Sequence, residues 1–282
     1  MTKKRKKWSL LFLVIAFIIV WLIWGNKTIA TTEYTIESDY LPKAFDGYRI
    51  TQISDFHNAN FGKENEKLLE KIQNANPDII VLTGDLIDSN HTDKAVALEL
   101  IKNAVQIAPC YFVTGNHEAW VGVTYTDFEK ELQLLNVKVL RNEAEDIEIN
   151  GETIQIIGLD DPAFAGESEG YLSSSEIIAD ELSKIRHDAF TILLSHRPEA
   201  FSTYVQAGAD LVFSGHAHGG QFRIPFIGGI VAPDQGFFPT YDAGLFKEGK
   251  TSMVVSRGIG NSIIPFRINN RPEIVTVVLK GR

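Results

Sequence analysis

The sequence has one cysteine, Cys110, and a single thiol excludes an internal disulfide bond. Cys110 stands in an apolar run with Tyr111, Phe112 and Val113, which is typical of a small residue in a hydrophobic core. The chain also lacks internal repeats and low-complexity segments, which argues against a repeat architecture. Hydrophobic residues at 44% and charged residues at 22% are ordinary globular values, so the composition excludes a disordered chain.

Positive charge is scarce beyond the N-terminus. The formal net charge is −9, and the first 27 residues hold six basic side chains and no acidic one, so the remainder carries −15. A nucleic-acid-binding protein needs a basic surface against the phosphate backbone. We therefore expect no nucleic-acid partner. At 282 residues, the chain is long enough to bury the core of one large domain or two small ones.

The N-terminus combines a basic cluster at residues 3–7 with fifteen consecutive apolar residues, 10–24. Counted from Trp8, a helix of seventeen residues is roughly 25 Å long, close to the thickness of the hydrocarbon core of a bilayer. Trp8, Trp21 and Trp24 stand near its two ends, where indole rings prefer the membrane interface. A buried core helix does not fit, because the segment is apolar on every face and follows five cations.

We therefore expect residues 1–27 to form a cytoplasmic basic tail and a transmembrane signal anchor. The excess of positive charge before the apolar run places everything after about residue 28 outside the cytoplasm, as a single-pass protein of the cell membrane. The alternative is a signal peptide cleaved near Thr28-Ile29-Ala30, which would release a secreted or wall-associated protein. The length of the apolar run favours the anchor.

Beyond the anchor, apolar runs rich in Ile, Val and Phe predict buried strands. Five of them are followed at once by a polar residue that can bind metal: 49–54, 78–84, 111–115, 191–195 and 211–215. Apolar residues at helical spacing predict helices at 64–74, 93–106, 173–186 and 198–207, and Thr126-Asp-Phe-Glu129 predicts the start of a helix that ends at 135. Asn150-Gly151 predicts a hairpin turn, and strands are expected at 251–256 and 274–279. This order predicts an α/β (α+β) fold with helices outside two packed sheets.

The polar residues after the five predicted strands can converge, because ligands of open α/β sheets bind at the carboxyl ends of strands. These residues are Asp55, His57, Asp85, Asn116, His117, His196, His216 and His218. Each cluster alone could be a turn, a helix cap or a surface loop, but five at one type of structural position predict a metal site. Carboxylate, imidazole and amide ligands without thiolate suit manganese, iron or zinc. There are more ligands than one ion needs, and a bridging carboxylate would hold two divalent ions about 3.5–4 Å apart.

In their order, these residues resemble the five signature blocks of the calcineurin-like metallophosphoesterase superfamily. The blocks are Asp55-x-His57, Gly84-Asp85, Gly115-Asn-His-Glu118, His196 and Gly215-His-x-His218. Ser214-Gly-His-Ala-His-Gly-Gly-Gln221 and Ser256-Arg-Gly-Ile-Gly260 further resemble a bacterial membrane- or wall-associated phosphodiesterase branch, which includes enzymes similar to a UDP-2,3-diacylglucosamine pyrophosphohydrolase. The resemblance implies a four-layer αββα sandwich, with residues 28–46 as a linker or first strand and 47–282 as the catalytic domain.

The resemblance also implies a role for each matched residue. One ion would be held by Asp55, His57 and His218, the other by Asn116, His196 and His216, with Asp85 as the bridge. His117 would be the catalytic residue that contacts the substrate phosphate and assists the leaving oxygen. The implied reaction is attack of a metal-activated water on phosphorus. We expect hydrolysis of phosphodiester or pyrophosphate bonds in a lipid-linked or wall-linked substrate outside the membrane.

Two alternatives stay open. Ser89 and Thr114 stand where the phosphoprotein phosphatase branch has arginines, which argues against that activity and for diesters. A phosphomonoesterase remains an alternative, because Arg197 could supply the missing charge. A non-catalytic metal-binding module of the same fold is the second alternative, and the intact ligand set with His117 argues against it.

Weaker expectations concern substrate contacts. Arg197, Trp120 and Gln221 are the candidates, although an exposed surface position is the more usual one for an arginine, and Trp120 could equally pack against its neighbours. Arg223, Arg257 and Arg267 could also meet the substrate. The apolar loop 222–238 either contacts lipid or belongs to the core.

Overall fold

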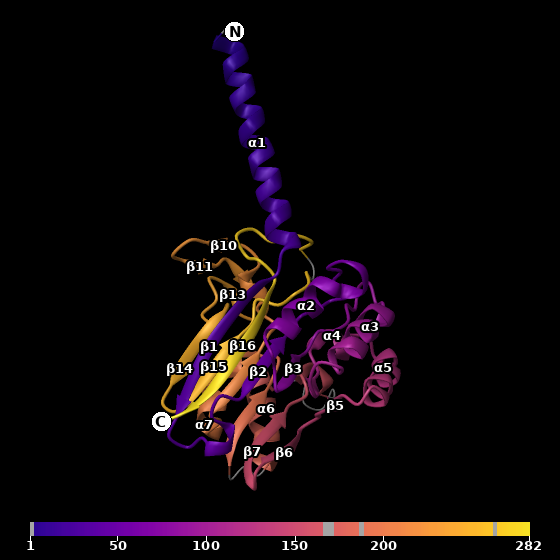
Figure 1. Ribbon diagram of the computed structural model, residues 1–282, viewed down its shortest axis with the longest axis vertical. Coiled ribbons are helices and arrows are strands. Elements are labelled where there is room, and N and C mark those ends of the chain that lie inside the picture. Colours follow the sequence, from indigo (N-terminus) through magenta and orange to yellow (C-terminus); the bar gives the residue numbers. More distant parts are fainter. Residues whose placement is uncertain (1–2, 166–171, 186–188, 262–263) are drawn as a thin grey trace.

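The computed structural model describes residues 3–165, 172–185, 189–261 and 264–282. Its most prominent feature is α1 (Lys3–Lys27), a single helix that projects from one end of the domain (Figure 1). Residues Lys7–Lys27 are long and apolar enough to cross a membrane, and none of that segment is buried against the domain. Only Thr28 and Ile29 separate α1 from the first strand, so the helix joins the domain without a flexible linker.

Two six-stranded sheets form the centre of the domain. The first contains, in spatial order, β1 (Ala30–Ser38), β16 (Glu273–Gly281), β2 (Arg49–Ile53), β3 (Ile79–Thr83), β4 (Cys110–Val113) and β5 (Lys138–Val139). The second contains β14 (Gly244–Glu248), β15 (Thr251–Val255), β9 (Leu211–Ser214), β8 (Phe190–Leu194), β7 (Glu152–Gly158) and β6 (Glu143–Ile149). The neighbours β2, β3 and β4 are parallel, as are β7, β8 and β9, so each trio ends at one edge of its sheet.

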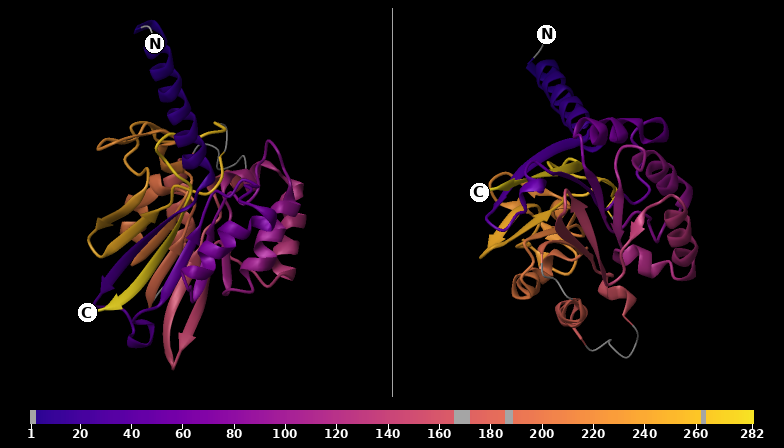
Figure 2. Two further views of the ribbon diagram at one scale, coloured as in Figure 1. Left: turned by 45° about the horizontal axis from the view of Figure 1, so that its top comes forward. Right: turned by 60° about the horizontal axis from the view of Figure 1, so that its bottom comes forward.

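Helices cover the two outer faces (Figure 2). A buried apolar cluster joins the first sheet to α2 (Glu66–Asn74), α3 (Lys94–Ala104) and α5 (Val123–Leu134). A second cluster lies between the sheets, and a third joins the second sheet to α6 (Ser174–Lys184) and α7 (Phe201–Ala207). These three cores between four layers confirm the predicted αββα sandwich.

Most predicted elements lie within two residues of their predicted bounds. The hairpin of β6 and β7 turns at Asn150-Gly151, both with positive φ as such turns require. The strands predicted at 251–256 and 274–279 are β15 and β16, and Cys110 is a free, buried residue of β4. The helix predicted at 173–186 is α6, whose last predicted residue falls outside the described residues.

The predicted start of α5 at Thr126 is wrong. The helix begins at Val123, after Gly122, because the turn that ends α4 (Asn116–Trp120) leads directly into it. The predicted helix 198–207 also begins differently, as a 3₁₀ turn at Pro198–Ala200 that continues into α7. Further 3₁₀ turns are η1 (Lys43–Phe45), η2 (Lys63–Asn65), η3 (Pro162–Phe164) and η6 (His218–Gly220).

Most of the apolar loop 222–238 lies outside the core, although Ala232 is buried in the third cluster. It forms two small ribbons, from β10 (Arg223–Ile224) with β11 (Gly228–Gly229) and from β12 (Val231–Ala232) with β13 (Gly236–Phe237). Five of its large apolar side chains are exposed: Ile224, Phe226, Ile227, Phe237 and Phe238. The ribbons lie at the end of the domain from which α1 projects (Figure 1). Of the two expectations for this loop, the core interpretation is therefore wrong for these five residues.

Candidate metal centre

The five predicted clusters meet where the carboxyl ends of the two parallel trios face each other. The residues after β2, β3 and β9 form one group, Asp55, His57, Asp85 and His218, and their ligand atoms lie within 4.8 Å of one another. A second group with the same spacing contains Asp85, His196 and His216. All of these side chains are buried. Asp85 belongs to both groups, which is the arrangement that a bridging carboxylate requires.

The first group has the geometry of a ligand set that converges on one point. His57 Nε2 lies 3.3 Å from His218 Nε2, and His218 Nε2 lies 3.3 Å from Asp55 Oδ1. Asp85 Oδ2 lies 3.5 Å from His57 Nε2 and 3.2 Å from His196 Nε2. Two neutral ring nitrogens facing each other between carboxylates suit a divalent cation better than they suit each other.

Asn116 supplies independent evidence for a missing partner in the second group. Its Oδ1 is buried and accepts no hydrogen bond from the described residues. A buried amide oxygen without a partner costs about 1–3 kcal/mol, so such atoms need an explanation. Since Asn116 begins α4 beside Asp85, a cation in the second group would satisfy it. The residues present therefore fit a pair of divalent ions.

The two groups differ in protonation. Burial lowers the pKa of His218 to about 3 and also lowers that of His57, so both rings are neutral and ready to bind metal. Burial alone would lower the pKa of His196 too, but the Asp85 carboxylate opposes it and raises that pKa to about 10. The same contact holds the pKa of Asp85 well below its usual range, despite burial. Without metal, His196 and Asp85 are thus an ion pair.

Local backbone conformation positions these side chains. Five of the clustered residues have φ between +44° and +63°, a region that costs non-glycine residues about 1–3 kcal/mol: Asp55, His57, Asp85, His216 and His218. Glycines beside them allow the close approach of the loops. A Cβ on Gly215 would lie 2.5 Å from Asp55 Oδ2, and one on Gly84 would lie 2.6 Å from His196 Nδ1.

Glu118 holds two of the loops together. Its carboxylate accepts hydrogen bonds from the backbone N–H groups of Asp85 (2.8 Å), Ile87 (3.2 Å) and Gly115 (2.7 Å). Burial and the charge of Asp85 raise the pKa of Glu118 to about 8. The fourth residue of the Gly-Asn-His-Glu block therefore has a structural explanation, since it ties the loop after β3 to the loop after β4.

His117 lies at the edge of the first group, with its ring centroid 4.5 Å from that of His57. Its Nδ1 accepts the backbone N–H of Ser89 at 3.0 Å. A backbone N–H can only donate, so Nδ1 carries no hydrogen and, in the neutral ring, the hydrogen is on Nε2. His117 therefore presents a hydrogen-bond donor at Nε2.

Arg197 is neither a surface residue nor free. Its Nε and Nη2 donate to the two oxygens of Asp161 at 2.6 and 2.8 Å, and its Nη1 is paired with Asp234. The same Nη1 lies 3.1 Å from His216 Nε2, which is 2.9 Å from Asp234 Oδ2. Glu199 Oε1 also lies 3.7 Å from Nη1, so three carboxylates surround the Arg197 charge.

The other residues that we expected to contact the substrate lie in different places. Trp120 is 61% exposed, and its ring centroid lies 4.9 Å from that of His117. Gln221 is buried and donates to the carbonyls of Ile264 and Phe266, so it braces a loop. Arg223 pairs with Asp242, whereas Arg257 and Arg267 line a separate pocket.

Sequence reasoning missed Asp161 and Asp234. A signal for Asp161 was present, because Asp160-Asp161 follow β7 as the other clusters follow their strands. Asp234 belongs to the turn between β12 and β13, and nothing in its local sequence distinguishes it from an ordinary turn residue.

Comparisons with known proteins agree with this geometry. The family model of calcineurin-like phosphoesterases matches residues 48–220. An uncharacterized metallophosphoesterase, YkuE of Bacillus subtilis, is 33% identical over 90% of this chain and 86% of its own length. Phosphodiesterase YaeI of Escherichia coli is 29% identical over 72% of this chain and 70% of its own. A transmembrane protein with metallophosphoesterase domain from Danio rerio is 29% identical over 88% of this chain and 56% of its own. The chain belongs to the calcineurin-like metallophosphoesterase family, and it is a metal-dependent phosphoester hydrolase.

Proposed function

We propose that the protein is a two-metal hydrolase of phosphodiester or pyrophosphate bonds. The observation that carries the proposal is the pair of buried ligand groups that share Asp85. Asp55, His57 and His218 hold one ion, Asn116, His196 and His216 hold the other, and Asp85 lies between them. Manganese, iron and zinc suit these nitrogen and oxygen donors.

Two ions at these positions would supply an activated water and positive charge next to the phosphoryl oxygens. The chain's own contribution to the chemistry is His117. Its Nε2–H is fixed as a donor by the Ser89 contact, so it can hydrogen-bond to a phosphoryl or leaving oxygen as negative charge develops there. Trp120 beside it forms an exposed aromatic wall that can hold the substituent of a substrate.

The charges favour a diester. A monoester dianion needs more positive charge than a diester monoanion, and Arg197 was the residue that could supply it. The contacts with Asp161 and Asp234 neutralise Arg197 instead. The centre therefore offers the two ions and the Nε2–H donor of His117, a combination suited to one negative charge.

The test of this preference is the ratio of kcat/KM for bis-p-nitrophenyl phosphate and p-nitrophenyl phosphate at equal metal loading. The proposal predicts a ratio above one both in the unaltered protein and in the Arg197→Ala variant. A ratio well below one in both proteins would establish a phosphomonoesterase. No turnover of either ester at two ions per chain would support a non-catalytic module.

We also propose that α1 is a retained membrane anchor and that residues 47–282, with β1 completing their first sheet, form an extracytoplasmic catalytic domain. The basic cluster before α1 supports this orientation. Contacts at the alternative cleavage site, residues 28–30, support retention of α1. Ile29 is buried, and Ala30 N–H donates to Pro272 O at 2.7 Å, so this site is packed into the domain. Fusions of alkaline phosphatase and green fluorescent protein to the C-terminus test the orientation. The proposal predicts that the alkaline phosphatase fusion is active and that the green fluorescent protein fusion does not fluoresce. The reverse pattern would contradict it.

A further inference from the structure

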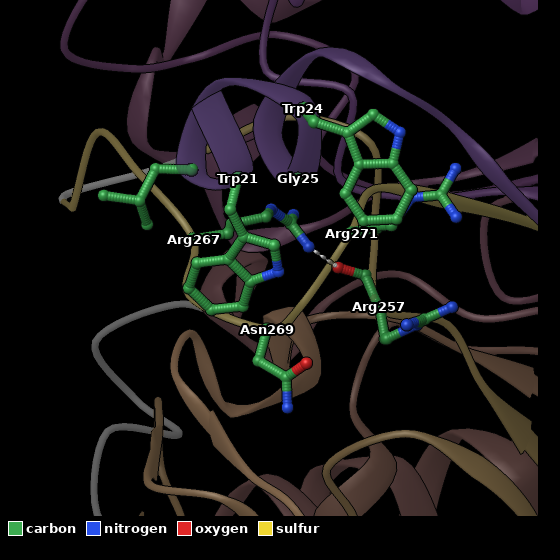
Figure 3. Close-up of a pocket in the computed structure, with 8 residues that line it drawn as sticks. Trp21, Trp24, Gly25, Arg257, Arg267, Asn269 and Arg271 are labelled. Carbon is green, nitrogen blue, oxygen red and sulfur yellow. Dashed lines mark hydrogen bonds between the residues drawn. The ribbon is translucent and has the colours of Figure 1, made fainter. Parts of the chain in front are cut away.

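A pocket of about 180 Å³ lies between the end of α1 and residues 257 and 267–271 (Figure 3). Trp21 and Trp24 of α1 form one wall. The lining also includes three arginines, Arg257, Arg267 and Arg271, and the exposed Asn269. The pocket is separate from the metal centre, and the proposed hydrolysis makes no use of it.

The guanidinium groups are held mainly by neutral partners. Arg267 is 1% exposed and donates to the carbonyls of Arg257 (2.6 Å) and Gly260 and to Asn261 Oδ1 (3.0 Å). Arg271 donates to Thr28 Oγ1 at 3.0 Å and to Ile29 O at 3.3 Å. Its guanidinium carbon also lies 4.5 Å from the centre of the Trp24 ring.

Negative charge around these groups is small. Within the described part of the chain, Glu273 is the one carboxylate that their hydrogen bonds and ion pairs reach, and it pairs with Arg257. Burial lowers the pKa of Arg267 to about 10, although the negative charges of Asp55 and Glu273 oppose this shift. The three guanidinium groups thus have a single carboxylate paired with them, and an anion in the pocket would relieve the remaining excess of positive charge.

The chemistry of the pocket fits a phosphate group. Arginine is suited to phosphate because its planar fork donates two parallel hydrogen bonds. The cavity has room for about six water molecules at roughly 30 Å³ each, which is enough for a phosphodiester group with a small substituent. The indole walls leave an apolar side toward α1, where a glycerol backbone and the first acyl carbons can lie.

The position of the pocket favours a lipid as the source of that phosphate. Trp21 and Trp24 stand at the domain end of the apolar run, where indole rings prefer the headgroup level of a bilayer. The 222–238 loop, which has several exposed apolar side chains, lies at the same end of the domain (Figure 1). The ring of exposed Phe266 lies 5.4 Å from that of Phe222 in this loop. With α1 in the membrane, both features place the arginine pocket among lipid headgroups.

We propose that this pocket is a binding site for the anionic headgroup phosphate of a membrane phospholipid. The site rests on the membrane placement of α1 given under the proposed function, but not on any hydrolytic activity. Arg271 and Arg257 contact the phosphate oxygens, buried Arg267 supplies charge beneath them, and Trp21 and Trp24 contact the glycerol end. The lipid fastens α1 to the segment whose Gly260 N–H donates to the backbone carbonyl of Asp55 at 2.6 Å.

The test uses the full chain reconstituted in nanodiscs that contain equal amounts of phosphatidylglycerol and phosphatidylcholine. Native mass spectrometry after release from the disc gives the ratio of the two lipids that stay bound. We expect phosphatidylglycerol to be retained preferentially. Since each cation near a membrane surface contributes about a fivefold preference, Arg271→Gln should lower the ratio by about fivefold.

Two further variants keep the test decisive. Lys27→Gln removes a charge at the same end of α1, but Lys27 is exposed and outside the pocket. The ratio of bound lipids in this variant should therefore match the ratio in the unaltered chain. Asn269→Asp adds a carboxylate to the pocket lining without removing an arginine contact and should lower the ratio as Arg271→Gln does. Metal content shows that each variant is folded, independently of activity.

Three results would overturn the proposal. The first is an equal loss of phosphatidylglycerol in Lys27→Gln and Arg271→Gln, which would reduce the effect to general surface charge. The second is an unchanged ratio in both pocket variants. The third is displacement of the retained lipid by millimolar inorganic phosphate, which would assign the pocket to free phosphate instead of a lipid.

Discussion

Asn26 and Arg267 exchange two hydrogen bonds across 241 positions of sequence. Asn26 Nδ2 donates to Arg267 O at 2.9 Å, and Arg267 N–H donates to Asn26 Oδ1 at 2.7 Å. Arg267 in turn donates to Gly260 O, and Gly260 contacts Asp55. Two residues, Arg267 and Gly260, therefore link the end of the proposed membrane helix to Asp55, a proposed metal ligand, through direct contacts.

Asn26→Leu should loosen this junction. The substitution leaves the Arg267 N–H and carbonyl without their partners, a loss of about 1–2 kcal/mol that raises local opening 5- to 30-fold. Hydrogen exchange of the amides at 26–30 in the full chain measures the opening. Lys27→Leu changes an exposed neighbour and is the matched control. Equal exchange rates in the two variants would show that the pair does not hold the junction.

The sequence alone predicts the strand ends well, for a physical reason. Each apolar run stops where the chain leaves the core, and a buried polar residue directly after such a stop must have a partner. That reasoning places Asp55, Asp85 and His196 at one edge before any contact is known. It fails at Thr126, because a capping pattern inside a helix is indistinguishable from one at its start.

Contacts between distant segments lie beyond such reasoning. Arg197 could be predicted near the site, but its neutralisation by Asp161 and Asp234 depends on how the loops after β7 and β12 pack against it. The left-handed conformations of Asp55 and His57 are likewise not predictable from local sequence, since a positive φ is uncommon for any non-glycine residue. The arginine pocket needs α1 and residues 257 and 267–271 side by side, a pairing that local patterns do not encode.

His117→Ala should keep both ions and lower kcat for bis-p-nitrophenyl phosphate by about 10²–10³, the usual cost of losing one positioned donor to a developing negative charge. His91→Ala is the matched control, because His91 is exposed. Metal analysis and steady-state kinetics check both variants. A metal-depleted His117→Ala protein would mean that His117 is a ligand and that its assigned role is wrong.

The two ions should bind with different pH dependence. His57 and His218 are already neutral, so the first ion displaces few protons at neutral pH. The pKa of His196 is raised to about 10, so below that pH the second ion must displace a proton, and its affinity should rise with pH by up to tenfold per unit between pH 6.5 and 8.5.

Calorimetric titration of the metal-free protein with Mn²⁺, in buffers of different ionisation enthalpy, counts the displaced protons. His196→Gln should abolish the pH-dependent step and spare the first. Two steps with the same pH dependence would contradict the assignment of His196 and Asp85 as an ion pair in the metal-free protein.

The most direct test of the two-metal account joins metal content to hydrolysis in one variant, Asp85→Asn. A shared carboxylate offsets the repulsion between two cations, so its loss should lower the content from two ions per chain to one or fewer and abolish hydrolysis of bis-p-nitrophenyl phosphate. Asp93→Asn, which alters the exposed cap of α3, should retain both ions and full turnover. Two tightly bound ions and near-normal turnover in Asp85→Asn would contradict the account.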